Sequence, residues 1–376
     1  KLNGDEVPNS DVTINPYDFN TSIYSIDRLI LGGVESNYAL LIPEFQREYT
    51  WEDEDIERLF SDLLLGFSSS IKEKSGHFFG ATVWNKRNRT DLEPDFTISS
   101  YDIVDGQQRI TTCLLLLISL MIIIRKNQKE IDEENAINPK LEKWLKTEYS
   151  SVRQNIYEMI NGDMRWADLP YPRLIQEEDI RAKKREDKKY ESPIAQILME
   201  AGKAIDQDDE IKFDEITVNS EQENVLDKLK NNISKFIELI SKIDDKDCYK
   251  DLNIPYVKVD DLKKRNFLDF LNKENPPPQS EFDSTLIRND LFKKQIRCIQ
   301  FYGFFLKAAC FTVITCEDDD AAFSIFDSLN TTGVPLTAIE TLKPYVMRDH
   351  QRDNSTFKNT DSYENFDYVE KIIRSP

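Results

Sequence analysis

Hydrophobic residues recur at spacings of three and four along two stretches of the chain, which is the pattern of a helix with one buried face. The first stretch follows Thr50, whose hydroxyl is placed to cap the amide of Asp53. The second predicts a long helix in the middle of the chain. The apolar positions are Ile56, Leu59, Phe60, Leu63 and Phe67 in the first stretch, and Leu226, Leu229, Ile233, Phe236, Ile237, Ile240 and Ile243 in the second.

Apolar runs without this spacing indicate strands and one fully buried helix. Residues 114–124 are apolar on every side, which predicts that a helix over residues 106–126 lies between layers. Residues 85–95 are charged and turn-rich, as in a hairpin loop between two strands. Strands that enclose a buried helix predict an α/β or α+β domain over about residues 20–130. The predicted strands cover residues 38–42, 78–84, 96–104 and 310–316.

The order of these elements divides the chain into regions. Beyond residue 130, charged helical segments alternate with polar linkers, and a strand-like run returns near the end. With 376 residues and a prior of about 150 residues per domain, two or three domains are expected. The predicted regions are a lead-in over residues 1–24, an α/β domain over 25–130, a helical domain over 131–308, and a strand with further helices over 309–376.

Charge and composition exclude several classes of protein. The formal net charge of −20 repels nucleic acid on average, so contact with DNA or a nucleotide requires a local basic site or a metal ion. Two histidines argue against a structural zinc site, a His-metal nuclease and a Ser-His-Asp triad. None of the five cysteines forms a Cys-x-x-Cys pair, so reduced thiols in a cytoplasmic protein are expected. The longest apolar run is shorter than the roughly 20 residues of a membrane span.

Residues 103–109 (IVDGQQR) are the strongest candidate for chemistry because they join a predicted strand to a predicted helix. Asp105 is placed to cap this helix with Gln108 at the reciprocal position, and Gly106 lets a ligand approach the backbone. The free amides of the first helical turn form an anion site, to which Arg109 adds a guanidinium suited to two phosphate oxygens. The alternative is a capped helix whose arginine pairs with a nearby carboxylate, and the residues alone favour neither.

Two further segments combine polar side chains with turn residues. Residues 42–51 (IPEFQREYTW) place Gln46 and Arg47 just before the first predicted helix. Residues 326–336 (FDSLNTTGVPL) end one helix and lead into a second capped helix that carries Lys343. Taken singly, each segment is better explained as structure: an aromatic hinge in the first case and a helix–loop–helix corner in the second.

Together, the three segments resemble the N-terminal domain of GmrSD-type restriction endonucleases, also called domain of unknown function 262, of the ParB/sulfiredoxin-like superfamily. The family pattern I-P-x-[FY]-Q-R-x-Y-x-W is matched by residues 42–51, I-[IV]-D-G-Q-Q-R-[LI]-T-T by residues 103–112, and F-x-x-[LI]-N-x-x-G-x-x-L by residues 326–336. Order and spacing agree over residues 25–348. The resemblance implies a small mixed-sheet ParB-like domain followed by a largely helical domain, with the last strand and helices returning to the sheet.

The resemblance also implies a function in restriction systems that defend against modified or foreign DNA. It implies binding and hydrolysis of GTP or ATP with Mg²⁺ at the D-G-Q-Q-R segment. By position, the catalytic residues would be Asp105, Gln107, Gln108 and Arg109, and Asp105 would hold the metal ion. The nucleotide would also be bound by Gln46, Arg47, Gly106, Asn330, Gly333 and Lys343.

Two features depart from the family pattern. Many relatives have Arg or Lys at the position of Thr332 and Asp at the position of Glu340. Many also continue into an HNH nuclease domain, whereas nothing after His350 resembles an H-N-H constellation. We therefore expect a regulatory or sensor portion that controls an HNH nuclease domain or subunit outside this chain, with no nuclease activity of its own.

Two competing hypotheses belong to other classes of protein. One is a non-catalytic DNA-sensing module, and the other is an interaction module in which the motifs only stabilise the corner where three segments meet. Homo-oligomerisation stays open. The basic residues available for DNA phosphates are Lys86, Arg87 and Arg89 in the predicted hairpin, and Lys183, Lys184, Arg185, Lys188 and Lys189, where acidic neighbours favour a solvated surface.

Overall fold

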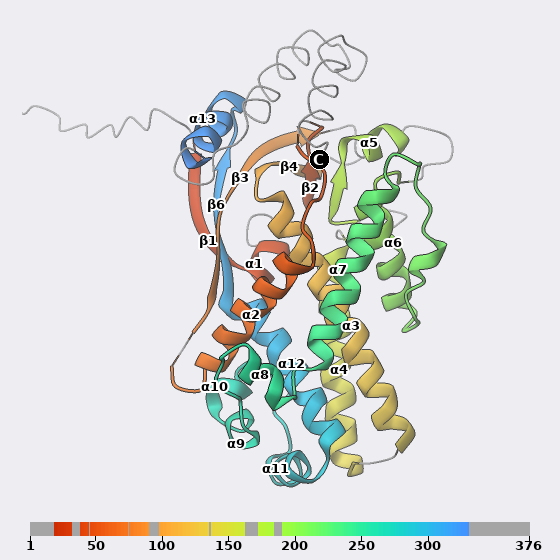
Figure 1. Cartoon of the computed structure of the whole chain (residues 1–376), viewed down its shortest axis with the longest axis vertical. Helices are drawn as coiled ribbons and strands as arrows, with labels where there is room; N and C mark the ends of the chain where they lie inside the picture. Colours follow the sequence, from red (N-terminus) through yellow and green to blue (C-terminus); the bar gives the residue numbers. More distant parts are fainter. Residues whose placement is uncertain are drawn as a thin grey trace, which may run out of the picture.

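A mixed sheet of six strands lies along one side of the molecule, and most helices lie along the other (Figure 1). The computed structural model describes residues 19–31, 38–44, 46–73, 75–89, 98–134, 137–161, 172–183 and 190–330. The strand order is β1-β6-β3-β4-β2-β5, in which β1–β6 and β3–β4 are antiparallel and the other pairs are parallel. The bounds are Phe19–Ser25 (β1), Tyr38–Ile42 (β2), His77–Arg89 (β3), Ile98–Asp105 (β4), Leu174–Gln176 (β5) and Ala309–Cys316 (β6).

Three strands correct the regions predicted from the sequence. The predicted lead-in ends early, because its last residues belong to β1, which pairs with β6 from the other end of the chain. The predicted hairpin loop over residues 85–95 is wrong in its first half, because β3 continues to Arg89 and pairs with β4. The predicted helical domain contributes β5, which pairs with β2 at one end of the sheet order.

The helices follow the predicted apolar spacings closely, with shifted ends. α3 continues to Glu134, eight residues beyond the expected end at residue 126. Between residues 279 and 308 the chain forms two helices, which meet at Asn289. The bounds are Ile26–Leu31 (α1), Asp53–Ser69 (α2), Gln107–Glu134 (α3), Pro139–Ile160 (α4), Glu177–Lys183 (α5), Pro193–Asp206 (α6), Glu223–Ser241 (α7), Lys246–Asp251 (α8), Val259–Leu262 (α9), Arg265–Leu268 (α10), Gln279–Arg288 (α11), Asp290–Ala308 (α12) and Asp319–Asn330 (α13), with a 3₁₀ turn at Phe213–Glu215.

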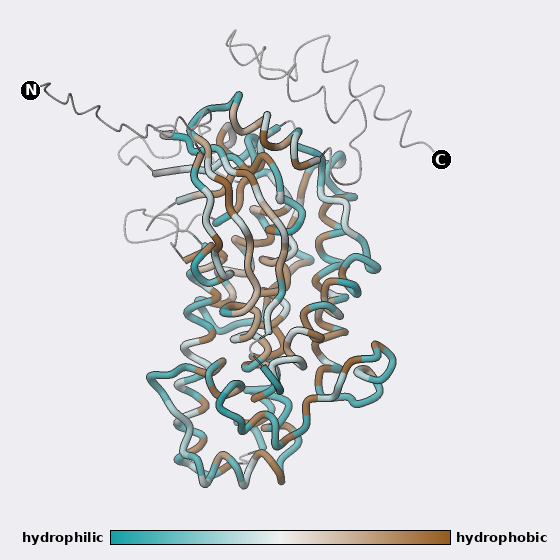
Figure 2. The backbone as a smooth tube through the Cα atoms, turned by 90° about the vertical axis from the view of Figure 1, so that its left-hand side faces the viewer, coloured by the Kyte–Doolittle hydropathy of each residue, from teal (hydrophilic) through white to brown (hydrophobic). Residues whose placement is uncertain are grey.

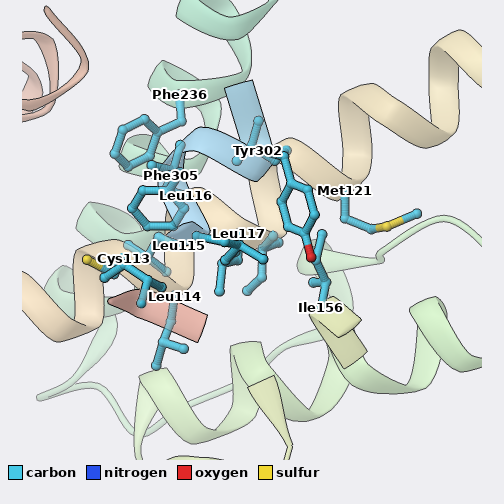
Figure 3. Close-up of a cluster of buried hydrophobic side chains, with 14 of the residues drawn as sticks. Cys113, Leu114, Leu115, Leu116, Leu117, Met121, Ile156, Phe236, Tyr302 and Phe305 are labelled. Carbon is cyan, nitrogen blue, oxygen red and sulfur yellow. The ribbon is translucent and has the colours of Figure 1, made fainter. Parts of the chain in front are cut away.

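Helix α3 is the centre of the hydrophobic core. Its residues 114–117 are four consecutive leucines, all inaccessible to solvent, so the helix is covered on every side, as its sequence predicts. Figure 3 shows them among Phe236 of α7, Ile156 of α4 and Phe305 of α12. One cluster of buried apolar residues extends from Ile26 to Val313, so the sheet and the helical region share a core. The mixed sheet followed by a helical region is therefore confirmed.

α3 is longer than the apolar run seen in the sequence, and by length and composition alone it could span a membrane. However, 89% of its most apolar window is buried inside the structure. The buried core helix of a soluble protein has the same length and composition. All five cysteines are free thiols, and burial raises the pKa of Cys113 within α3.

The other face of the sheet is partly covered by α13. A second cluster joins Ala322 and Phe323 of this helix to Val83 of β3, Val104 of β4 and Cys316 of β6. Figure 2 views the molecule from the side of β1, β6 and β3 and shows hydrophobic segments along the strands. The end of β4, from which α3 begins, therefore lies between α13 on one face and the main core on the other.

The core predicts a sharp contrast between two neighbouring leucines of α2. Leu64 is inaccessible to solvent in the main core, whereas Leu65 is 46% exposed. Leu64→Ala should lower the free energy of unfolding by about 2–5 kcal/mol because it leaves a cavity, while Leu65→Ala should change it by less than about 0.5 kcal/mol. Urea unfolding of both variants measures the difference. Equal effects would show that α2 does not bury the face described here.

Candidate functional site

A glycine turn joins β4 to α3 at the D-G-Q-Q-R segment. Gly106 has φ of +97°, and a Cβ there would lie 2.5 Å from Oγ1 of Thr82. That hydroxyl donates to the carbonyl of Asp105 at 2.5 Å and accepts from Nε1 of Trp84 at 2.9 Å. The turn is therefore packed tightly against β3, which explains why a residue without a side chain occupies this position.

Two buried glutamines at the start of α3 hold the segment between β2 and α2, residues 46–51, which has no helix or strand of its own. Nε2 of Gln107 donates to the carbonyl of Arg47, and Nε2 of Gln108 donates to the carbonyl of Glu48, both at 2.9 Å. The amide of Thr50 donates to Oε1 of Gln108, also at 2.9 Å. The two carboxamides thus supply partners for backbone groups of the 46–51 segment.

These bonds correct two predicted helix caps. The capping pair of Asp105 and Gln108 is wrong, because both ends of the Gln108 carboxamide bind the 46–51 segment instead. Thr50 does not begin the helix, because α2 starts at Asp53, and the carboxylate of Asp55 accepts from the amide of Glu52 at 3.1 Å. Both glutamines therefore join the first motif to the second.

The same segment brings Gln46 and the backbone of Arg47 to the D-G-Q-Q-R turn, whereas the nucleotide contacts that the family resemblance implies for them stay a prediction. Nε2 of Gln46 donates to the carbonyl of Val104, the residue before Asp105, at 2.7 Å. Arg47 is exposed, although Gln107 holds its carbonyl. A guanidinium is thus carried at the surface on a backbone that is fixed at neighbouring positions.

Arg109 pairs with the carboxylate of its own motif. Nη2 of Arg109 lies 2.7 Å from Oδ2 of Asp105, and Nη1 donates to the carbonyl of Phe79 at 2.7 Å. The two side chains keep 25% and 28% of their surface exposed. These bonds use two of the five N–H groups of a guanidinium. The alternative foreseen for this arginine, pairing with a carboxylate, is therefore present, and the pair stays accessible to solvent.

A bulge in β3 places the carbonyl that Arg109 binds. The register of β3 against β6 shifts between Phe78 and Ala81, and Gly80 within this bulge has φ of +92°. A Cβ on Gly80 would lie 2.7 Å from Nη1 of Arg109. Gly80 therefore leaves room for the guanidinium. From the sequence alone, only a glycine within a predicted strand was visible at this position.

The third motif lies mostly outside the described residues. α13 ends at Asn330, while Gly333 and Lys343, together with Thr332 and Glu340, fall outside them. The predicted contribution of Asn330, Gly333 and Lys343 to a nucleotide site therefore stays a prediction. What the structure does place is α13 itself, against β3, β4 and β6 near the D-G-Q-Q-R turn.

The basic residues predicted to contact DNA lie on a strand. Lys86, Arg87 and Arg89 belong to β3. Arg87 is bound to Asp102 at 3.0 Å and to Asp319 at 2.5 Å. Burial opposes its charged form, but these two carboxylates outweigh burial and raise the pKa of Arg87. This arginine is committed to an ion-pair network that ties α13 to the sheet. Of the second basic cluster, Lys183 ends α5, and the following basic residues lie outside the described part.

A buried polar contact beside the site was not predicted from the sequence. Nδ2 of Asn232 on α7 donates to the hydroxyl of Tyr49 at 3.0 Å and to the carbonyl of Trp51 at 2.9 Å. The Tyr49 hydroxyl lies 2.7 Å from Oγ1 of Thr112 on α3. The signal was available, because Asn232 stands three residues after Leu229 on the face predicted to be buried.

Comparison with known proteins identifies the family pattern. Residues 30–347 match the model of the family described as "GmrSD restriction endonuclease, N-terminal domain". The match includes all three motifs and thus most of the chain. A search of curated proteins gives no match.

The hold of Gln108 on the 46–51 segment is directly testable. Gln108→Met keeps the length of the side chain but leaves the Thr50 amide and the Glu48 carbonyl without their partners. The free energy of unfolding should fall by about 1–3 kcal/mol, and the Thr50 amide should exchange faster with deuterium. Gln154→Met, at an exposed position of α4, is the matched control. Unchanged stability and exchange for Gln108→Met would contradict the role described for this glutamine.

Proposed function

Because the chain belongs to the GmrSD restriction endonuclease N-terminal domain family and so forms part of a restriction system, we propose that it is the nucleotide-binding, regulatory portion of that system. The proposed ligand is a nucleoside triphosphate, GTP or ATP. The proposed site is the corner formed by the D-G-Q-Q-R turn and the 46–51 segment.

The observation that carries this proposal is that the guanidinium of Arg109 and the backbone of Arg47 both lie at the start of α3. The first intrahelical bond of α3 runs from the amide of Ile110 to the carbonyl of Gly106, so the three amides before Ile110 have no intrahelical acceptor. Arg109 stays partly exposed on the first turn, and Arg47 is exposed on the segment held against it. Helix amides and guanidinium groups together favour a polyphosphate, since both stabilise negative charge.

The two glutamines divide into different roles. Gln108 has both ends of its carboxamide engaged, so we assign it to positioning the 46–51 segment. Gln107 donates through Nε2, while its Oε1 accepts no hydrogen bond from the described residues. We assign Gln107 to orienting a water molecule for hydrolysis, because an amide orients water without needing to change its protonation state. Gly106 allows the phosphates to approach the backbone.

Asp105 fits a magnesium ion that is held mainly by phosphate. Among the described residues, no group of three or more His, Cys, Asp or Glu side chains is placed to hold a metal ion. Mg²⁺ bound with a nucleotide needs only one or two protein carboxylates, since phosphate oxygens and water complete its six ligands. Oδ2 of Asp105 accepts from Arg109, and Oδ1 accepts nothing from the described residues. Bound there, Mg²⁺ would neutralise phosphate charge.

Binding and hydrolysis at this corner would regulate an HNH nuclease domain or subunit outside this chain, in a system directed at modified or foreign DNA. The competing hypothesis is a non-catalytic DNA-sensing or interaction module. The DNA-sensing hypothesis has less support, because Arg87, one of the cations that it assigns to DNA phosphates, is already paired with Asp102 and Asp319.

Calorimetric titration with GTP and with ATP, in the presence of Mg²⁺, tests the proposal. The parent chain should bind one of them, and Arg109→Ala should weaken binding about 10- to 100-fold, since each bond to a charged group contributes about 1.5–3 kcal/mol. Arg288→Ala, at an exposed position of α11, should bind as the parent does. A folded Arg109→Ala variant with parental affinity would exclude the site, and salt-sensitive DNA binding without nucleotide binding would favour the competing hypothesis.

A further inference from the structure

Helix α7 of the helical region is joined to the candidate site by a chain of buried hydrogen bonds. Both N–H groups of the Asn232 carboxamide are used, one on Tyr49 and one on the carbonyl of Trp51. Tyr49 continues to Thr112 on the second turn of α3. One side chain of the helical region thus contacts the 46–51 segment at two atoms and, through Tyr49, the helix that carries Arg109.

The donor and the acceptor of each hydrogen bond in this series can be assigned, which gives the series a direction. The hydroxyl of Thr112 donates to the carbonyl of Gln108 at 2.8 Å, so its oxygen is left as an acceptor. Tyr49 must therefore donate to Thr112 and accept from Asn232. The bonds run from the Asn232 amide through Tyr49 and Thr112 to the carbonyl of Gln108. Hydrogen bonds aligned in one direction polarise one another, so a change at either end alters the others.

This series of hydrogen bonds lies in the protein interior, where breaking any one of them costs free energy. Asn232 and Thr112 are buried, and burial raises the pKa of Tyr49 to about 12. The hydroxyl of Tyr49 therefore stays protonated, and so stays a donor, throughout the neutral range. A buried polar group that loses its partner costs about 1–3 kcal/mol, so the geometry of the 46–51 segment and the position of α7 are tied together.

We propose that Asn232 is a positioning residue that couples the helical region to nucleotide occupancy of the D-G-Q-Q-R corner. The inference rests on the function proposed above and adds the element through which the site is regulated. A nucleotide that orders the 46–51 segment stabilises the position of α7 in which Asn232 reaches both Tyr49 and Trp51. By thermodynamic reciprocity, a displacement of α7 weakens nucleotide binding by the same factor.

Two further contacts of α7 support this coupling, because they hold the helix in place within one turn of Asn232. Oγ of Ser119 on α3 lies 3.3 Å from the carbonyl of Ile233, next to Asn232. Nζ of Lys235 lies 2.5 Å from Oε1 of Glu57 on α2, the helix that follows the 46–51 segment. α7 is thus held against both helices that flank the site, and Asn232 is its contact with the segment between β2 and α2.

The test compares Asn232→Ala and Tyr49→Phe with Asn231→Ala. Asn231 is an exposed neighbour of the same type on the same helix, which makes it a matched control. With Mg²⁺ and GTP or ATP, whichever the parent chain binds, the first two variants should raise the dissociation constant between about 2- and 30-fold, and the control should not. Nucleotide should also slow deuterium exchange in residues 223–241 of the parent chain, and less in the two variants.

The outcomes separate this inference from the function on which it rests. If the parent chain binds neither nucleotide, the proposed function fails and the coupling fails with it. If the parent binds but both variants melt at lower temperature with parental dissociation constants and parental protection of α7, Asn232 is only structural and the coupling alone is overturned. Should Asn232→Ala not fold, Tyr49→Phe gives the decision, because it removes one hydroxyl and keeps the ring.

Discussion

The structure around the candidate site depends on one constraint: residues 46–51 have no regular structure, so their backbone groups need partners from elsewhere. The carboxamides of Gln107 and Gln108 provide three of these partners, and the Gln46 side chain in turn donates to the carbonyl of Val104 at the end of β4. Without these bonds, the backbone that carries Arg47 would not be fixed beside Arg109. The two glutamines of the D-G-Q-Q-R motif thus explain, in physical terms, why the first two motifs occur in one chain.

The rigidity of this corner derives from the core behind it. α3 begins at the site and then passes through the main hydrophobic cluster, covered on all sides by apolar residues. The turn at Gly106 is packed against Thr82, and the bulge at Gly80 makes room for Arg109. A site placed on the first turn of a buried helix has little freedom to shift, which is what binding a polyphosphate through several fixed donors requires.

Much of the fold could be predicted from periodicity, because strongly periodic segments report their own burial. The helices containing Leu63 and Ile233 were predicted from their spacing, and the buried helix at Leu114 from its unbroken apolar run, although the ends of these helices were less well predicted. The pairing of β1 with β6 could not be, since nearly 300 residues separate the partners and neither strand specifies the other. Which motifs meet was foreseen from the family resemblance. The contact of Gln108 with the 46–51 segment was not foreseen, because a glutamine at this position is equally compatible with capping its own helix.

The central claim is that the corner between the 46–51 segment and the start of α3 receives a nucleoside triphosphate. Hydrogen–deuterium exchange on the full chain, with Mg²⁺ and non-hydrolysable analogues of GTP and ATP, tests it most directly. The account predicts that one analogue slows exchange at residues 46–51 and 105–110 together, since both sides of the corner would be ordered by one ligand. Unchanged exchange in both segments at saturating analogue, or protection confined to a distant surface, would contradict it.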